Sequence, residues 1–210
     1  MIAVERLARR YGVRWALKDV SFHIRDSSVV MIAGPNGSGK STLFRVLSTA
    51  IRPHRGSVTI DGWDLTRHRD DIRKSVALLT HASYLYEPLT GLENLRIFAD
   101  HLGKSRAGLM PLLERVGLAT RANDPVSAYS AGMRKRLSFA RVLLQEPRVV
   151  MLDEPYGQLD PEGFTLVDEV VCELRERGAT VLMATHQIER GTKLSDAAVF
   201  LEAGRVVSAC

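Results

Sequence analysis

The chain has 210 residues, 45% of them hydrophobic, so it can bury one good core and at most a modest subdomain beside it. No apolar run approaches the roughly 20 residues of a membrane-spanning helix, and the charged start MIAVERLARR is unlike a signal peptide. Two cysteines are too few for a disulfide scaffold, so Cys172 and Cys210 are interpreted as free thiols. The net charge of +5 suits nucleotides, anionic lipids and nucleic acid equally well.

Four short apolar runs predict strands that are buried on both faces, which is typical of a parallel sheet. In chain order they are VVMIA at 29–33, VALLT at 76–80, RVVML at 148–152 and TVLMA at 180–184. Between them, apolar residues recur at helical spacing around positions 43–47, 137–144 and 166–174. This alternation of strands and helices predicts the α/β fold class.

The segment from about 82 to 146 has no buried strand pattern and contains a helix-capping pattern, Thr90 followed by Glu93. We therefore expect a helical subdomain inserted between two strands. Farther on, Asp160 can cap a helix that has proline in its first turn and ends before Gly178. No repeat or long linker divides the chain, so residues 1–210 are expected to form one domain.

The first motif with recognisable chemistry is a glycine-rich loop between the strand at 29–33 and the following helix. Its glycines let backbone N–H groups close on phosphate oxygens, and the positive end of the helix points at the same charge. Lys40 is expected to reach the β- and γ-phosphates, and the Ser41 hydroxyl to bind Mg²⁺. The predicted nucleotide contacts are Gly34, Pro35, Asn36, Gly37, Ser38, Gly39, Lys40, Ser41 and Thr42. Such a loop alone does not distinguish a transporter ATPase from a kinase or a GTPase.

Two adjacent carboxylates, Asp153 and Glu154, end the third apolar run. The carboxyl ends of strands are where α/β folds present ligand-binding groups. Asp153 is expected to hold the Mg²⁺ shell, and Glu154 to accept a proton from the water that attacks the γ-phosphate. The alternative is a solvated acidic turn after a core strand.

A third segment, YSAGM at 129–133, precedes the helical pattern RKRLSFARVLL. With this segment between the phosphate loop and the acidic pair, the chain resembles the nucleotide-binding domain of ABC transporters. The family's signature is Leu-Ser-Gly-Gly-Gln, so only Ser130 and Gly132 match it. The resemblance implies that these two residues face the ATP held by an opposite subunit, whereas on the residues alone Ser130 is equally well a plain helix cap. It also implies a P-loop NTPase (RecA-like) core with a mostly parallel sheet and an N-terminal antiparallel β portion.

Further positions fit the same resemblance. It implies that Tyr11 stacks on adenine, that Asp160 contacts the opposite subunit as well as capping its helix, and that His186 hydrogen-bonds the γ-phosphate or the attacking water. The alternatives are a surface tyrosine and a structural histidine. His81 stands where most of the family has a glutamine that senses Mg²⁺ and the membrane partner, so it joins Ser41 and Asp153 as a candidate metal ligand. Its alternative is a histidine packed at a strand end, without contact to the site.

The resemblance therefore implies an ATPase that uses ATP and Mg²⁺, pairs with a second ATP-binding subunit as a homodimer or heterodimer, and drives integral membrane permease subunits. It implies a cytoplasmic place, peripheral on the inner face of the cell membrane, and no direct contact with nucleic acid. The short length and the segments SAGMRKRLSFAR and ATHQIERG resemble the ATP-binding subunits of haem exporters used in cytochrome c maturation.

Three alternatives stay open at this stage. The first is the ATPase of another small-molecule, lipid or drug exporter. The second is a non-transport ABC ATPase that acts on nucleic acid, although such proteins usually carry a coiled-coil insertion or tandem cassettes, which this sequence lacks. The third, a P-loop kinase, would leave the YSAGM segment unexplained.

Overall fold

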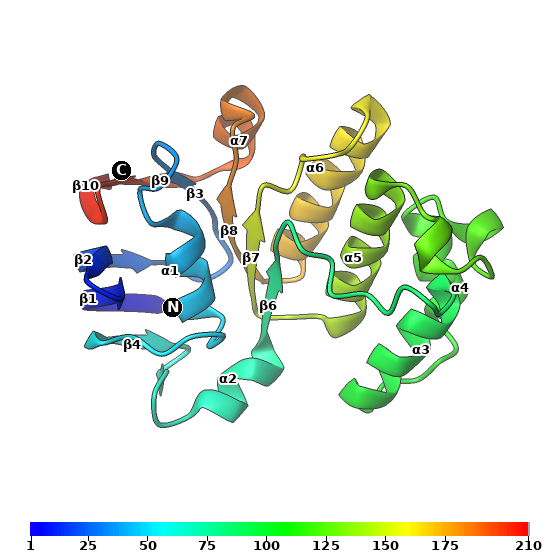
Figure 1. The fold of residues 1–210 in the computed structure, drawn as a ribbon, viewed down its shortest axis with the longest axis horizontal. Coiled ribbons are helices and arrows are strands. Elements are labelled where there is room, and N and C mark those ends of the chain that lie inside the picture. Colours follow the sequence, from blue (N-terminus) through cyan, green and yellow to red (C-terminus); the bar gives the residue numbers. More distant parts are fainter. Residues whose placement is uncertain (210) are drawn as a thin grey trace.

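A computed structural model describes residues 1–209 and arranges them in two sheets with helices between and beside them (Figure 1). The smaller sheet is antiparallel throughout, and it is the antiparallel β portion that the family resemblance implies. Its strands, in spatial order, are β2 (Arg14–Ile24), β1 (Ile2–Tyr11), β4 (Arg55–Ile60) and β5 (Trp63–Asp64).

The larger sheet is mixed and mostly parallel, since only its outermost strand, β10, runs antiparallel to its neighbour. Its strands, in spatial order, are β10 (Arg205–Ala209), β9 (Ala197–Glu202), β3 (Val29–Ala33), β8 (Thr180–Ala184), β7 (Val149–Asp153) and β6 (Val76–Leu79). The α/β fold class is thereby confirmed, and all four predicted buried runs are strands of this sheet.

The helices lie between consecutive strands or in the segment 82–146 predicted as a helical subdomain. In chain order they are α1 (Lys40–Leu47), α2 (Arg69–Ser75), α3 (Gly91–Leu102), α4 (Leu109–Arg115), the 3₁₀ helices η1 (Ala119–Arg121) and η2 (Val126–Ala128), α5 (Ala131–Gln145), α6 (Pro161–Glu176) and α7 (Ile188–Leu194). The predicted capping pattern begins α3: the Glu93 N–H donates to Thr90 Oγ1 at 3.1 Å, and the Thr90 N–H donates to Glu93 Oε2 at 2.8 Å. Within residues 1–209 no helix has the length and apolar character needed to cross a membrane.

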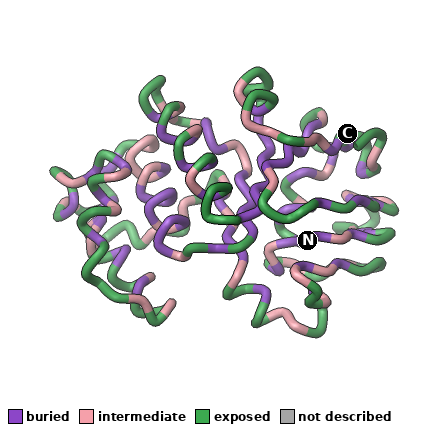
Figure 2. The backbone as a smooth tube through the Cα atoms, turned by 180° about the vertical axis from the view of Figure 1, so that it is seen from behind, coloured by how far each residue is buried: buried purple, intermediate pink, exposed green. Residues whose placement is uncertain are grey.

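Both faces of the larger sheet are covered, which explains why its strands are continuous apolar runs. On β7, Val149 and Met151 pack toward α1 and the smaller sheet, whereas Val150 and Leu152 pack toward α5 and α6. This alternation follows the two-residue repeat of a strand. Figure 2 shows the buried residues running through the middle of the molecule and the exposed ones on outer turns and helix sides. Of the two predicted free thiols, Cys172 is free and exposed, and Cys210 lies outside the described residues.

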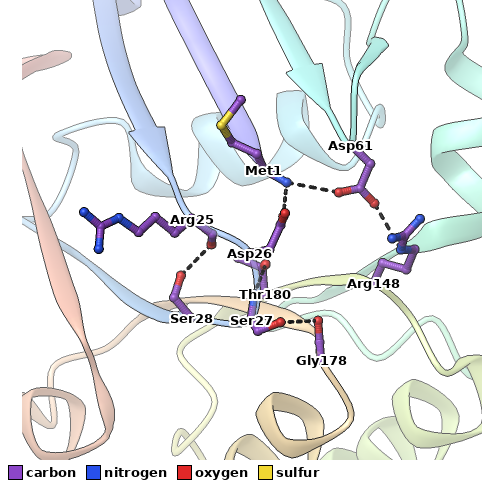
Figure 3. A network of polar contacts seen from close by, with 9 residues as sticks. All are labelled: Met1, Arg25, Asp26, Ser27, Ser28, Asp61, Arg148, Gly178 and Thr180. Atoms are coloured by element: carbon purple, nitrogen blue, oxygen red, sulfur yellow. Dashed lines mark hydrogen bonds and ion pairs between the residues drawn. The ribbon is translucent and has the colours of Figure 1, made fainter.

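A polar network ties the amino ends of the central strands to the smaller sheet (Figure 3). The Ser27 N–H donates to Thr180 Oγ1 and the Ser27 hydroxyl donates to Gly178 O, both at 3.1 Å. Asp61, in the turn between β4 and β5, pairs with Arg148 just before β7 at 3.2 Å. These contacts join the start of β3 to that of β8, and the start of β7 to the smaller sheet. Because the three strands run parallel, their carboxyl ends meet at one edge of the sheet.

Candidate functional site

The carboxyl ends of three parallel strands face one cavity of about 810 Å³, within the roughly 300–1,000 Å³ range of small-molecule sites. The glycine-rich loop follows β3, the acidic pair ends β7, and His186 lies just after β8. The predicted site residues that line the cavity are Tyr11, Asn36, Gly37, Gly39, Lys40, Ser41, Thr42, Asp153, Glu154 and His186. The structure thus brings together residues from both ends of the chain.

The glycine-rich loop is packed so closely that two of its glycines have no room for a side chain. Gly34 has φ 139°, and a Cβ on it would lie 2.0 Å from the Leu201 carbonyl oxygen. Gly39 has φ 114°, and a Cβ on it would lie 2.7 Å from the Ala16 carbonyl oxygen. The Gly204 N–H also donates to Ser38 O at 3.0 Å. The back of the loop is therefore held by the backbone of β2 and of the β9–β10 turn.

Lys40 lies along the inside of this loop. Its ammonium donates to Gly34 O at 2.6 Å and to Pro35 O at 3.0 Å, and only 9% of the residue is exposed. A phosphate oxygen is a charged acceptor and forms stronger hydrogen bonds with an ammonium than a carbonyl does. The position of Lys40 therefore suits the binding of a phosphate group in the loop.

Glu154 and His186 are in contact at the edge of the cavity. The His186 N–H donates to Glu154 Oε2 at 3.2 Å, and the imidazole Nε2 lies 3.4 Å from Glu154 Oε1. Glu154 has φ 51°, a left-handed conformation that costs a non-glycine residue about 1–3 kcal/mol and is concentrated at functional sites. Its own N–H donates to Ala184 O at 2.8 Å, so it is tied to the end of β8. A fixed carboxylate beside an imidazole is an arrangement suited to proton transfer.

Ser130 and Gly132 do not line the cavity of their own chain. Ser130 is exposed and caps α5, where its hydroxyl oxygen accepts from the Met133 N–H at 3.2 Å. A Cβ on Gly132 would lie 3.0 Å from Gln158 O, so the first turn of α5 packs against the loop that follows β7. The structure thus confirms the helix cap, and it leaves the face that carries Ser130 open to solvent.

Asp160 also lies outside the cavity. Its carboxylate accepts from the Gly163 N–H at 2.8 Å and pairs with Arg136 at 3.1 Å, so the predicted cap of α6 is present. The Gly163 N–H hydrogen bond and the Arg136 guanidinium lower the pKa of Asp160 below its usual value. The carboxylate is therefore held ionised between two helices.

His81 is placed apart from the other two candidate metal ligands. It is exposed and lines a separate hollow of about 110 Å³ together with Ser83, Ala131, Arg134 and Lys135. It does not line the larger cavity, where Ser41 and Asp153 lie. The hollow adjoins the start of α5, so His81 is a neighbour of the YSAGM segment.

Four residues of β2 that the sequence patterns did not single out line the cavity beside Tyr11. They are Arg14, Trp15, Ala16 and Lys18, and Trp15 carries the only ring among them. The guanidinium carbons of Arg10 and Arg55 lie 5.7 Å and 5.9 Å from the Trp15 ring centroid. Cations over an indole hold it by attraction to the face of the ring. The signal in the sequence is RRYGVRW at 9–15, in which two aromatic residues stand among three arginines.

Lys135 is another residue that sequence reasoning missed. It lies on α5 and is 6% exposed, and its ammonium donates to the Glu154 carbonyl oxygen at 3.0 Å. Burial lowers the pKa of Lys135 to about 8, and the nearby carboxylates of Asp153 and Glu154 act in the opposite direction. A buried cation therefore lies directly behind the acidic pair.

Residues 17–157 match the family described as ABC transporter. A daunorubicin resistance ATP-binding protein of Streptomyces coeruleorubidus is 40% identical over 99% of this chain and 67% of that protein. A lantibiotic transport ATP-binding protein of Streptococcus pyogenes is 31% identical over 99% of this chain and 89% of that protein.

Solved structures agree with these relatives. The ATP-binding subunit of an ABC transporter has a TM-score of 0.92 at 30% identity, over 100% of this chain and 89% of that one. A dimeric post-hydrolysis state of an ATP-binding cassette with ADP and Pi has a TM-score of 0.91 at 26% identity, over 100% of this chain and 98% of that one. The chain belongs to the ABC transporter family. Within that family it is an ATP-binding subunit, and its enzymatic class is that of an ATPase.

We expect Gly34→Ala to destabilise the protein more than Gly37→Ala. Both glycines have positive φ, 139° and 77°, but a Cβ on Gly37 meets no atom within 4 Å, whereas one on Gly34 meets the backbone of β9. Backbone strain alone should cost Gly37→Ala about 1 kcal/mol, and the added clash should bring Gly34→Ala to about 3 kcal/mol or more. Urea unfolding of both variants measures the difference, and equal losses would contradict the close packing behind the loop.

Proposed function

We propose that this chain hydrolyses MgATP as one half of a head-to-tail dimer and thereby powers export through separate integral membrane permease subunits. Its place would be the cytoplasm, peripheral on the inner face of the cell membrane, without direct contact to nucleic acid. The observation that carries the proposal is the convergence of Lys40, Glu154 and His186 on one cavity from the ends of three parallel strands. Each of these side chains has a separate task in phosphoryl transfer.

The glycine-rich loop and Lys40 bind the triphosphate. Backbone N–H groups of the loop and of the amino end of α1 donate hydrogen bonds to the phosphate oxygens, and the Lys40 ammonium moves from the two loop carbonyls to the β- and γ-phosphates. Tyr11 is 45% exposed at the cavity wall, where its ring can stack on adenine. Trp15 extends the same wall.

Glu154 accepts the proton of the attacking water, and His186 orients that water or the γ-phosphate. The contact between Glu154 and the His186 backbone N–H supports these two roles. It fixes the carboxylate, and 33% of the Glu154 side chain stays exposed. A general base must lie within hydrogen-bond reach of the proton that it removes. The left-handed backbone of Glu154 turns its side chain toward the cavity wall shared with His186.

Ser41 and Asp153 are the residues that would hold Mg²⁺. Both line the cavity, and their two oxygen ligands fit a cation that keeps several waters and takes its other ligands from phosphate. No cluster of three or more His, Cys, Asp or Glu side chains suited to a metal was found in the part of the chain that the structure describes. When bound, Mg²⁺ neutralises charge on the β- and γ-phosphates. We assign His81 no direct bond to the cation, and propose it as a link between the site and the permease.

Ser130, Gly132 and Asp160 would complete the site of a second subunit. None of them lines the cavity of its own chain. Ser130 lies exposed at the amino end of a 15-residue helix, α5. The positive end of such a helix attracts phosphate. A head-to-tail dimer would bring this end to the γ-phosphate of the partner, and the dimeric cassette among the similar structures supports such pairing.

The cargo that we propose for the permease is haem, delivered for cytochrome c maturation. This part of the proposal is supported by the segments SAGMRKRLSFAR and ATHQIERG. A second candidate is export of a drug or a peptide antibiotic. It is favoured by the names of relatives, which describe daunorubicin resistance, lantibiotic transport and, in Mycobacterium tuberculosis, fluoroquinolone export.

Glu154→Gln should lower ATP turnover at least about 100-fold while ATP binding persists, because the amide keeps the shape and loses the basicity. MgATP should then trap a dimer that is visible by size-exclusion chromatography. Glu162→Gln is the matched control, because Glu162 is exposed in the first turn of α6 and lines no part of the cavity. Turnover of Glu154→Gln at the wild-type rate would remove Glu154 from its role.

Mixing two inactive variants should restore activity if Ser130 acts on the partner's nucleotide. Ser130→Arg and Lys40→Ala each spoil both sites of their own homodimer. A heterodimer of the two has one site with an intact Lys40 and an intact Ser130. An equimolar mixture should therefore regain about a quarter of wild-type turnover if subunits pair at random and sites act independently. A mixture no more active than its components would contradict the shared site.

The cargo can be tested in the native host by deleting the gene for this chain. If haem is exported, c-type cytochromes should lose covalently bound haem, and cytochrome c maturation proteins should co-purify with the tagged chain. Intact c-type cytochromes together with increased drug sensitivity would overturn the haem proposal in favour of drug export. Complementation with Lys40→Ala should fail in either case, since both depend on ATP binding.

A further inference from the structure

We propose that Lys135 is a positioning residue that holds Glu154 in place from the α5 helix of the same subunit. The inference rests on the proposed role of Glu154 as the base. Lys135 touches neither the cavity nor the proposed ligands, so it would act through Glu154 rather than on the reacting atoms.

The burial of Lys135 calls for an explanation, because lysine is almost never fully buried without a partner. Lys135 is 6% exposed, and within residues 1–209 the one hydrogen bond of its ammonium goes to a neutral acceptor, the carbonyl oxygen of Glu154 at 3.0 Å. A methionine would fill a similar volume without the cost of taking a charge out of water. Packing alone therefore does not explain why a charged side chain is buried here.

The bond from Lys135 is made at the most constrained point of the acidic loop. The Glu154 carbonyl accepts from the Lys135 ammonium at 3.0 Å and from the Gly157 N–H at 3.2 Å, while the Glu154 N–H donates to Ala184 O at 2.8 Å. Glu154 itself has φ 51°. A strained residue persists only when its surroundings hold it there. Of these three hydrogen bonds to the Glu154 main chain, only the one from Lys135 comes from a side chain.

The charge of Lys135 adds to the effect of the hydrogen bond. Its ammonium attracts the carboxylates of both Asp153 and Glu154, which are adjacent in sequence and repel each other. A buried cation behind them reduces this repulsion, since interactions between charges are stronger away from water. Without it, the Glu154 side chain would be free to move away from Asp153 and from the His186 N–H that it now accepts.

The position of Lys135 on α5 gives the contact a second consequence. Ser130 caps the same helix, so one rigid element carries both the group proposed to touch the partner's nucleotide and the group that restrains Glu154. Movement of α5 on dimer closure would reach Glu154 through the Lys135 bond. Each subunit would then sense the occupancy of its partner's site at its own base.

Lys135→Met tests the inference. We expect the kcat for ATP to fall about 10- to 100-fold, because a displacement near 1 Å of a reacting group has an effect of this size. KM and the affinity for MgATP should stay within about threefold of wild type, because no nucleotide contact is lost. Lys135→Arg keeps a charged donor and should regain at least about a third of the wild-type kcat.

Lys104→Met is the matched control. The Lys104 ammonium pairs with Glu146, the C-cap residue just after α5, so the same substitution removes a bond at the far end of the same helix. Its kcat should equal that of wild type. The double variant Lys135→Met, Glu154→Gln should still form the MgATP-trapped dimer, which shows that loss of Lys135 leaves the fold and the interface intact.

The possible results separate the two proposals. If Lys135→Met keeps kcat within twofold of wild type while Glu154→Gln is inactive, the positioning role of Lys135 is overturned, and the role of Glu154 as the general base is supported. The role is equally overturned if affinity for MgATP or thermal stability falls in step with kcat, since the lysine is then only structural. If Glu154→Gln is itself active, Glu154 is not the general base, and the inference about Lys135, which depends on that role, is overturned as well.

Discussion

The parallel pairing of β3, β8 and β7 is the constraint on which the rest of the site depends. β8 lies between the other two strands, and its Ala184 is level with Asp153 of β7. The Glu154 N–H continues this ladder by one bond beyond the strand, to Ala184 O. Because parallel strands end at one edge, segments more than a hundred residues apart reach one cavity. Main-chain hydrogen bonds, rather than contacts between the functional side chains, set the geometry of the chemistry.

Sequence patterns predicted those elements whose local pattern agrees with their surroundings. VVMIA and TVLMA are fully buried strands, and Thr90 and Glu93 form the capping box that their spacing indicates. β9 was not predicted. Only Val199 and Leu201 of its six residues are buried, because this strand lies near the edge of the sheet and its alternate side chains face outward. Its run AAVFLE is apolar in five of six positions, and a short apolar run of this kind cannot be assigned to a strand or a helix by periodicity alone.

The site residues that were not predicted from the sequence owe their positions to packing between distant segments. Lys135 stands in the run RKR, which is typical of a solvated helix face, and it is buried only because α5 packs against the loop after β7. Trp15 reaches the cavity wall through the register of β1 and β2, which sets it opposite Arg10. No local pattern carries that information. The glycine-rich loop and the acidic pair were found because their chemistry needs adjacent residues.

The close packing behind the phosphate loop has an evolutionary consequence. Gly204, in the β9–β10 turn, donates to Ser38 O at 3.0 Å, and a Cβ on it would lie 2.7 Å from the Ala16 carbonyl oxygen. Surface hairpins ordinarily tolerate insertions and are favoured places to cut or permute a chain. This hairpin is instead part of the wall that shapes the loop around Lys40. Lengthening it, or opening the chain there by circular permutation, would loosen the phosphate loop from the far side, so we expect insertions that this subunit tolerates to lie elsewhere.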